Sequence, residues 1–454
     1  MVYRHLCLPS RRLVALAPAI LATATAPAWA LSQQQPKSQP DLSKPLTLSQ
    51  CISIALKSQP SLAIARSRQD ASEARVTSAM SDYFPHVGPK VQYSFDRSRS
   101  DMDGGAVTVR SESTVSSLTV RQLLYDTGRR EANVASARAG AAASRYGLAD
   151  TRLGVILDVT SGYYEVLRSR ELVRVQVTNA ERARTTLESV RAAVEAQTVR
   201  KIDTLQADAD YANAMVQVSI AKNDARLAEI TLRKSMGIST PVAVVLAETP
   251  TPAPSAEPDA RTAASYIDAA LRERPDLKEL DAGIESSRQS TRLAKISSGV
   301  VLEANASASY WLNPDGGDSQ SVIAAVTYPL FDAGLARSQV RSATAAEEQA
   351  RQQLELQRQA VQLEVEQAYL LKEEARARSA AAEAATASAK ANFEAASESY
   401  TNGAGTVVDV ITARSQLVTA ETNAVQAIYD FHVAEARLAR ATGTADKVAA
   451  GGNG

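Results

Sequence analysis

The chain contains two copies of one sequence pattern, and this duplication limits its fold more than any other feature. The stretch QLLYDTGRR (122–130) recurs as YPLFDAGLA (328–336). The resulting spacing of 206 residues (328 − 122) continues without a gap for more than a hundred residues. Some of the pairs it defines are Asp126 with Asp332, Gly128 with Gly334, Asp203 with Asp409, and Leu232 with Leu438. The fold must therefore use one arrangement of elements twice.

The spacing widens to 215 residues further upstream, where ISIALKSQPSL (52–62) matches IDAALRERPDL (267–277). The nine extra residues (215 − 206) of the first copy are explained by the stretch SRSDMDGGAVTVRSE (98–112), which we expect to form a long loop. We expect a first repeat at 31–237, a Pro-rich linker at 238–261, a second repeat at 262–443 and a flexible tail at 444–454.

Each repeat is expected to contain short helices, a β-hairpin, a long helix and a returning helix. Apolar and polar residues alternate in the hairpins, whereas the helical patterns are long and free of proline. The expected bounds are hairpins at about 87–122 and 300–328, long helices at about 127–198 and 333–400, and return helices at about 203–236 and 406–442. About 70 helical residues extend for about 105 Å, which exceeds any compact domain.

The return helices carry small residues at every seventh position. The second copy has Ala413, Ala420, Ala427, Ala434 and Ala441, and the first has Ala207, Ala214, Ala221, Ala228 and Ser235. A small residue in each heptad lets helices approach closely, as in a coiled coil. Such packing needs few bulky residues, which agrees with an aromatic content of only 5%.

Residues 1–30 have the pattern of a secretory signal peptide. Basic residues precede an apolar run that ends in Ala28-Trp29-Ala30, and cleavage there would leave Leu31 as the first residue. We therefore expect export. Because Leu31 rather than cysteine follows the cleavage site, we expect no lipid anchor. Cys7 is removed with the signal peptide, so Cys51 has no cysteine partner for a disulfide within the chain.

The sequence offers no constellation for catalysis or cofactor binding. Only His86 and His432 remain after removal of the signal peptide, so neither a metal site nor a catalytic triad can be assembled. Phosphate-binding and dinucleotide-binding motifs are absent from the sequence. The 50 basic and 50 acidic residues balance and form no block suited to nucleic acid. We expect a protein that is not an enzyme, with no cofactor, no metal and no nucleic-acid partner.

The four strands per chain suggest how the protein meets a membrane. The mature chain lacks an apolar run of about 18 residues, so no spanning helix is expected. Alternating strands of about ten residues suit an outer-membrane barrel, but a barrel needs about eight or more strands. The chain therefore either oligomerises or forms soluble hairpins. Aromatic residues near the strand ends suit an interfacial belt, or reflect ordinary strand propensity: Tyr93, Phe95, Tyr310, Trp311 and Tyr328.

The order of these elements, repeated once, resembles the TolC family of outer membrane efflux and type I secretion channels over residues 46–443. The resemblance implies a mixed α+β fold and a homotrimer. Three chains would supply one twelve-stranded transmembrane β-barrel and a periplasmic tunnel of coiled-coil helices.

The resemblance also implies where the tunnel closes, namely where the long helices reverse near 195–203 and 400–409. Asp409 falls on a position that lines the constriction, Tyr400 on a residue that locks the closed state, and Asp203 on its partner position. The implied adaptor-docking tips contain Arg200, Lys201, Gly403 and Gly405.

Asp409 has a second interpretation that stands beside the first. Thr406 and Asp409 form the T-x-x-D pattern of a capping box at a helix start, whereas three Asp409 carboxylates around an axis would form a cation-selective ring. Thr412 stands where some family members have a second gate carboxylate. The first tip, EAQTVRKID, lacks the glycine seen in many family tips.

The motif that recurs as QLLYDTGRR and YPLFDAGLA is interpreted as the connection between a strand and the following long helix. Aspartate and glycine at this spacing favour a tight turn or a helix start, so we assign a structural role to the turns. These contain Asp126, Gly128, Pro329, Asp332 and Gly334.

The function implied is a passive exit duct across the periplasm and the outer membrane. An inner-membrane transporter and a periplasmic adaptor would supply energy and open the tip, and outer-membrane lipid would surround the barrel. The cargo stays open among a protein, a drug and a metal ion. The alternatives are a soluble periplasmic coiled-coil adaptor or structural protein, and an enzyme of unrecognised type.

Overall fold

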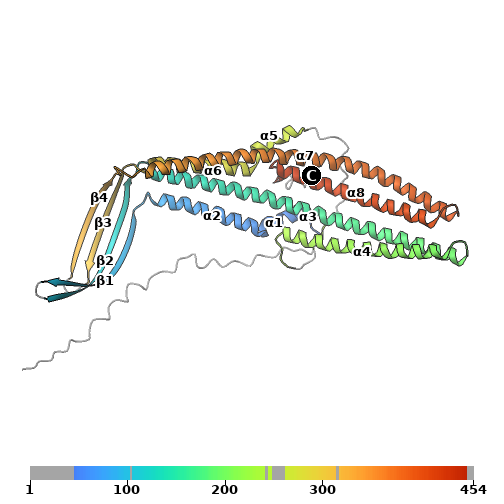
Figure 1. The fold of residues 1–454 in the computed structure, drawn as a ribbon, viewed down its shortest axis with the longest axis horizontal. Helices are drawn as coiled ribbons and strands as arrows, with labels where there is room; N and C mark the ends of the chain where they lie inside the picture. Colours follow the sequence, from blue (N-terminus) through green and yellow to red (C-terminus); the bar gives the residue numbers. More distant parts are fainter. Residues whose placement is uncertain (1–44, 103–104, 241–243, 248–260, 313–315, 447–454) are drawn as a thin grey trace, which may run out of the picture. The chain divides into compact units, whose positions relative to one another are not determined.

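The computed structural model describes residues 45–102, 105–240, 244–247, 261–312 and 316–446. The first repeat contains α1 (Leu48–Ser58), α2 (Pro60–Ser81), β1 (His86–Met102), β2 (Gly105–Tyr125), α3 (Arg129–Glu195) and α4 (Lys201–Ser235). The second contains α5 (Ala263–Glu273), α6 (Pro275–Ile296), β3 (Val301–Trp311), β4 (Gly317–Thr327), α7 (Leu335–Thr401) and α8 (Val407–Ala441). The order of elements is the same in both repeats (Figure 1), which confirms the internal duplication.

The helices of the two repeats match in length as well as in order. Equivalent helices have 11, 22, 67 and 35 residues in both copies. The 67-residue helices are continuous because alanine and unbranched polar residues, which favour helix, fill them without a proline. No helix in the described part of the chain has an apolar run long enough to cross a membrane.

The alanine heptads lie at the packing seam, as the sequence predicts. All five members in α8 are buried, from Ala413 to Ala441. In α4, Ala207, Ala214 and Ala228 are buried, while Ala221 and Ser235 are half-buried. Each return helix thus packs closely along its long helix, α4 on α3 and α8 on α7. The coiled-coil prediction is confirmed.

The two halves of the chain also pack on each other. Helix α8 packs along α3, α6 lies between α3 and α7, and α2 packs on α3. The largest apolar core surrounds Val159, Val166 and Leu232. Val244 and Leu246 join this core, and Leu246 bridges to Leu46. Part of the stretch expected to be a linker is therefore packed against the helices.

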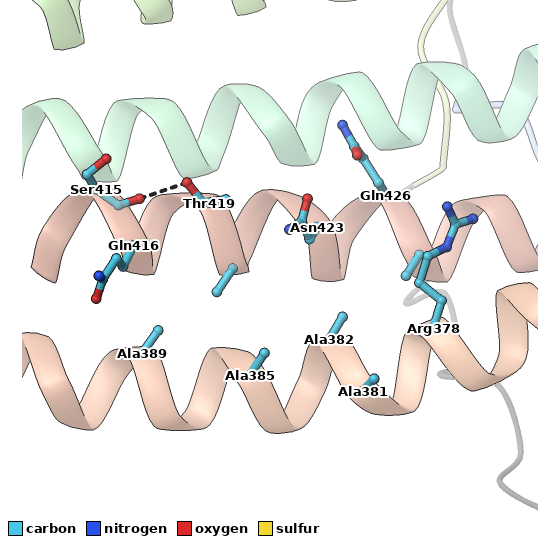
Figure 2. A pocket seen from close by; sticks show the side chains of 12 residues that line it. Arg378, Ala381, Ala382, Ala385, Ala389, Ser415, Gln416, Thr419, Asn423 and Gln426 are labelled. Atoms are coloured by element: carbon cyan, nitrogen blue, oxygen red, sulfur yellow. Dashed lines mark hydrogen bonds between the residues drawn. The ribbon is translucent and has the colours of Figure 1, made fainter. Parts of the chain in front are cut away.

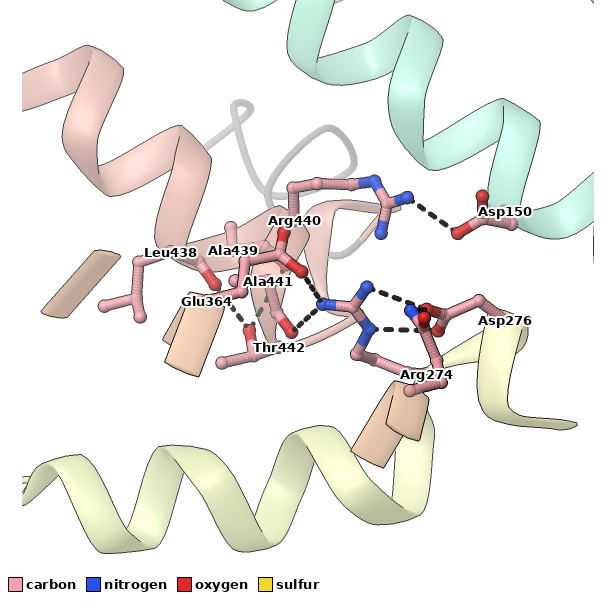
Figure 3. A network of polar contacts seen from close by, with 10 residues as sticks. Asp150, Arg274, Asp276, Glu364, Leu438, Ala439, Arg440, Ala441 and Thr442 are labelled. Carbon is pink, nitrogen blue, oxygen red and sulfur yellow. Dashed lines mark hydrogen bonds and ion pairs between the residues drawn. The ribbon is translucent and has the colours of Figure 1, made fainter. Parts of the chain in front are cut away.

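A buried arginine ties three helices of the second half together. The guanidinium of Arg274, 3% exposed, donates hydrogen bonds to Asp276 at 2.8 and 2.9 Å and to Glu364 at 2.5 Å (Figure 3). It also donates to the carbonyl of Ala441 at 3.1 Å, near the end of α8. Burial alone would raise the pKa of Asp276, but the hydrogen bonds and charge of Arg274, with a hydrogen bond from Gln357, hold it below its ordinary value.

The four strands form one antiparallel sheet in the order β1-β2-β3-β4. The confirmed strands of the first hairpin are longer than predicted, because pairing continues from His86↔Arg121 to Met102↔Gly105. The predicted loop at 98–112 is therefore wrong, and most of it is strand.

Candidate functional site

The sheet of a single chain is left uncovered. Within the described residues, helices make at most marginal contact with it, and β1 and β4 each pair on one side only. Val91 is 71% exposed and Val322 82%. A sheet with bare faces and two unpaired edges is unstable in water unless something else covers and pairs it.

One face of the sheet carries most of the large apolar side chains and is here called the apolar face; the other, which is mainly polar but includes Val115 and Ile323, is here called the polar face. Residues opposite one another in the register point to the same face. The apolar face contains Val87, Val91, Tyr93, Leu118, Val120, Leu302, Tyr310, Val322 and Val326. The polar face contains Lys90, Gln92, Ser94, Thr119, Arg121, Glu303, Asn305, Ser307 and Ser321.

The polar face makes hydrogen bonds within itself. The hydroxyl oxygens of Ser94 and Ser113 are 2.6 Å apart and those of Ser307 and Ser321 are 2.9 Å apart. Tyr310 of the apolar face lies next to the end of β3, whereas Tyr93 lies near the middle of the longer strand β1; both are more than half exposed. Trp311 belongs to the opposite face, so the five aromatic residues singled out in the sequence do not form a single belt.

Each strand-to-helix turn is fixed by an aspartate. The two carboxylate oxygens of Asp126 accept hydrogen bonds from the backbone N–H groups of Gly128 at 3.2 Å and Arg130 at 2.8 Å. Asp332 accepts from Gly334 at 3.0 Å and Ala336 at 2.8 Å, and these bonds lower its pKa.

The glycine of each turn serves as the N-cap of the long helix in a left-handed conformation. Gly128 has φ of 90° and Gly334 of 89°, where any other residue would be strained. Pro329 lies exposed in the segment between β4 and Asp332.

A contact that the sequence did not reveal joins the first turn to the second repeat. The hydroxyl of Thr127 donates a hydrogen bond to the carbonyl of Val300 at 2.8 Å. A Cβ on Gly299 would lie 2.4 Å from that hydroxyl oxygen, so only glycine permits the approach. No periodic pattern marks these residues, because the contact depends on how the two repeats dock.

The helices reverse in two tips with the same backbone path. Gly403 has φ of 74° in the second tip, and Gln197, 206 positions earlier, has φ of 61° in the first. Glycine adopts this conformation freely, whereas glutamine does so under strain. The first tip therefore makes the same turn without the glycine.

The structure brings the two tips together. An apolar cluster joins the helical hairpin of α3 and α4 to that of α7 and α8. It contains Leu187, Val190 and Ala207 of the former and Val407 of the latter, and Tyr400 packs against it. The Tyr400 hydroxyl oxygen is buried without a hydrogen-bond partner among the described residues. Burial, and then the charge of Asp203, raise the pKa of Tyr400.

Asp203 and Asp409 occupy equivalent positions in the third residue of α4 and α8. Asp203 is 9% exposed and accepts a hydrogen bond from the backbone N–H of Arg200 at 3.1 Å. Asp409 is exposed and forms the predicted capping box with Thr406. Hydrogen bonds from the Thr406 hydroxyl and backbone hold the pKa of Asp409 below its ordinary value.

Of the four tip residues predicted to dock a partner, three lie on the surface. The Arg200 side chain is 82% exposed, and Lys201 and Gly403 are also exposed. The fourth, Gly405, is half-buried, and it approaches the end of α7 so closely that an added Cβ would lie 3.1 Å from the backbone nitrogen of Tyr400. No cluster of three metal-ligating side chains occurs in the part of the chain that the structure describes.

Ion pairs that sequence reasoning missed join the two helical hairpins. Arg182 of α3 pairs with Glu421 of α8 at 3.1 Å, and Arg414 of α8 pairs with Asp210 of α4. Nearer the middle of the helices, Asp430 accepts from Arg168 at 3.3 Å and from Arg378 at 2.8 Å. The two residues of each ion pair lie more than 50 positions apart in the sequence, so no local sequence pattern could predict the pairs.

A duplicated chain whose bare four-stranded sheet continues through fixed turns into long helical hairpins has the fold of the outer membrane channel proteins. The chain belongs to the outer membrane efflux protein family, whose model matches residues 51–238 and 266–444.

Individual relatives agree with this assignment. The outer membrane efflux protein BepC of Brucella suis is 24% identical over 409 residues, which cover 88% of this chain and 87% of BepC. Protein CyaE of Bordetella pertussis is 26% identical over 310 residues, covering 66% of this chain and 63% of CyaE. The crystal structure of the outer membrane protein VceC from Vibrio cholerae shares the fold with a TM-score of 0.73 and 18% identity, covering 87% of this chain and 96% of that one.

Proposed function

We propose that this outer membrane efflux protein forms, as a homotrimer, the exit duct of a tripartite efflux pump or type I secretion system. The observation that carries the proposal is the sheet, which exposes an apolar face, a polar face and two free edges. Each of these features is unfavourable for a lone chain in water, and all are resolved together when strands from several chains close a barrel in lipid.

The two faces of the sheet assign its sides in such a barrel. The apolar face, with Val91, Tyr93 and Val322, faces outer-membrane lipid, and Tyr310 next to the end of β3 suits the membrane interface. The polar face, with Lys90, Gln92 and Glu303, lines the water-filled interior. Residues 1–30 act as the signal peptide that directs the chain to this membrane; they lie outside the described residues.

The helical tips form the periplasmic gate in this proposal. Tyr400 holds the second tip against the first near Asp203, as the shared apolar cluster supports. Three exposed Asp409 carboxylates, one from each chain, form a cation-selective ring, and the cap with Thr406 fixes their position. Arg200, Lys201, Gly403 and Gly405 lie at the tips, where a periplasmic adaptor joins the duct to an inner-membrane transporter.

Transport through the duct is passive, and no residue in it performs covalent chemistry. Fractionation of cell envelopes tests the proposal. The protein should sediment with outer membranes, and the complex extracted from them in detergent should have the mass of three chains. A monomer in the soluble periplasmic fraction would overturn the proposal.

A further inference from the structure

A cavity of about 360 Å³ lies where α8 of the second repeat packs on α3 and α4 of the first, and we name it the α3/α4/α8 cavity. Apart from Ala214 and Val418, every residue that lines it has a polar or charged side chain. Ligand pockets in proteins measure about 300–1,000 Å³ and usually have mainly apolar walls. This cavity therefore has the size of a pocket for a small molecule, with walls that suit a strongly polar one.

A buried arginine in the wall has hydrogen-bond donors to spare. Arg414 of α8 is 3% exposed, and its Nη2 atom donates a hydrogen bond to the carboxylate of Asp210 in α4. Its Nε and Nη1 atoms are buried without a hydrogen-bond partner among the described residues. Burying unpaired donors of a charged group is costly. These N–H groups are suited to an acceptor in the cavity, and a carboxylate forms the strongest bond of this kind.

The wall from α3 has hydrogen-bond acceptors to spare. Gln176 and Asn179 are three positions apart, so their side chains lie on the same face of the helix, and both line the cavity. Asn179 is only 8% exposed. The side-chain oxygen of each residue is buried without a donor among the described residues. The α3 wall is therefore suited to a group that carries several N–H donors, such as an ammonium.

The duplication shows that the helices can pack without these two acceptors. The residues 206 positions after Gln176 and Asn179 are Ala382 and Ala385. Both alanines line the groove of about 690 Å³ between α7 and α8 (Figure 2). Alanine therefore fits at the same positions of a helical hairpin with the same backbone. The two amide side chains serve a purpose other than packing the hairpin.

The balance of charge restricts the class of ligand. Arg414 and Asp210 are the two charged residues in the lining of the cavity, and their charges cancel. A simple anion would add an uncompensated negative charge beside Asp210, and a simple cation would leave the donors of Arg414 unpaired. An apolar molecule would leave all these polar groups unpaired. A molecule that carries both a carboxylate and an ammonium satisfies both walls without adding net charge.

We propose that the α3/α4/α8 cavity binds a small zwitterion of the α-amino acid type. Its carboxylate accepts hydrogen bonds from the guanidinium of Arg414, and its ammonium donates to the side-chain oxygens of Gln176 and Asn179. Because α8 belongs to one helical hairpin and α3 and α4 to the other, the bound molecule connects the two hairpins and stabilises their contact. The inference goes beyond the proposed function, since binding can be measured whether or not the protein conducts.

Calorimetric titration of the full-length, detergent-extracted protein with L-glutamine tests the proposal. We expect saturable binding of one molecule per chain, together with a rise in the melting temperature. Two analogues each lack one charge: N-acetyl-L-glutamine has no ammonium, and L-glutaminamide has no carboxylate. Each should bind about tenfold more weakly or worse. Binding of either analogue as tight as that of L-glutamine would overturn the zwitterion assignment, and no binding of L-glutamine would overturn the proposal as a whole.

Variants of the α3 wall locate the site. Gln176→Ala and Asn179→Ala introduce the residues of the second repeat and leave the pair of Arg414 with Asp210 in place. Each should weaken the binding of L-glutamine about tenfold. Arg184→Gln, which removes an exposed charge of α3, should bind like the wild type.

Wild-type affinity in both alanine variants would place the binding elsewhere and overturn the proposal. Loss of the proposal would leave the proposed function standing, because the mass of the extracted complex tests that function separately.

Discussion

The guanidinium of Arg182 in α3 donates hydrogen bonds to both carboxylate oxygens of Glu421 in α8, each at 3.1 Å. The two side chains are 26% and 21% exposed, so the pair is partly shielded from water. Since α3 belongs to the first hairpin and α8 to the second, this pair connects the two hairpins that separate if the periplasmic tip opens by moving one against the other.

Breaking this pair should loosen the tip. We expect Glu421→Gln to increase the ion conductance of the duct in planar bilayers, because the hydrogen bonds lose their charge. In a double-mutant cycle with Arg182→Gln, the coupling between the two side chains should contribute about 1 kcal/mol to the free energy of unfolding. The exposed pair of Arg184 with Glu188, within α3, is the control. Equal effects of the two pairs on conductance would contradict a role for Arg182 in holding the hairpins together.

Arg274 should contribute far more to stability than a surface arginine. Arg274→Gln introduces the residue found at the equivalent position 59 of the first repeat, yet it leaves the carboxylate of Asp276 without its charged partner. We expect the free energy of unfolding to fall by about 3 kcal/mol, as measured by thermal or urea unfolding of the extracted complex. Arg288→Gln, which removes an exposed ion pair with Glu285, should cost less than about 1 kcal/mol.

The same network of Arg274 and Asp276 predicts that the stability of the fold depends on pH. The pKa of Asp276 is lower in the folded chain than in the unfolded chain, so its stabilising contribution is complete above the unfolded value of about 3.9 and is lost as the pH falls through the folded value. Asp276→Asn should remove that part of the acid dependence of the melting temperature. An unchanged acid profile would show that the Arg274 network does not couple to folding.

Asp409 can be tested for its two roles separately. Asp409→Asn keeps a hydrogen-bonding side chain for the cap and removes the charge, so block of the channel by a trivalent cation should weaken while the helix remains intact. Thr406→Ala removes the hydroxyl that accepts from the Asp409 backbone and keeps the charge, so block should persist. The reverse pattern would leave Asp409 with the capping role alone.

Tyr400 should act through its ring rather than its hydroxyl. The ring packs against the apolar cluster shared by the tips, whereas the hydroxyl oxygen has no hydrogen-bond partner among the described residues. Tyr400→Phe should therefore keep the conductance of the wild-type protein, and Tyr400→Ala should raise it. If Tyr400→Phe raised the conductance as much as Tyr400→Ala, a hydrogen bond of the hydroxyl would be the true lock.

Features with a regular period or a repeated motif could be predicted from the sequence. The spacing of 206 residues predicted the duplicated element order, the proline-free runs predicted the long helices, and the alanine heptads predicted the buried seam of α8. The T-x-x-D pattern predicted the cap of Thr406 and Asp409, because capping depends on residues within one turn.

Features that depend on docking between distant segments could not be predicted. The pair of Arg182 with Glu421 spans 239 residues, and the approach of Thr127 to Gly299 depends on how the repeats meet. The stretch 98–112 was mistaken for a loop because polar serines and arginines hide its alternation, whereas cross-strand pairing makes most of it strand.

Single-channel recording with the purified wild-type protein in planar lipid bilayers is the sharpest test of whether several chains together form a duct. A pore can open only if strands from several chains close a barrel in the lipid. We predict discrete conductance steps of uniform size that appear only with protein of trimeric mass. An absence of steps, at protein amounts where a porin inserts readily, would contradict the account.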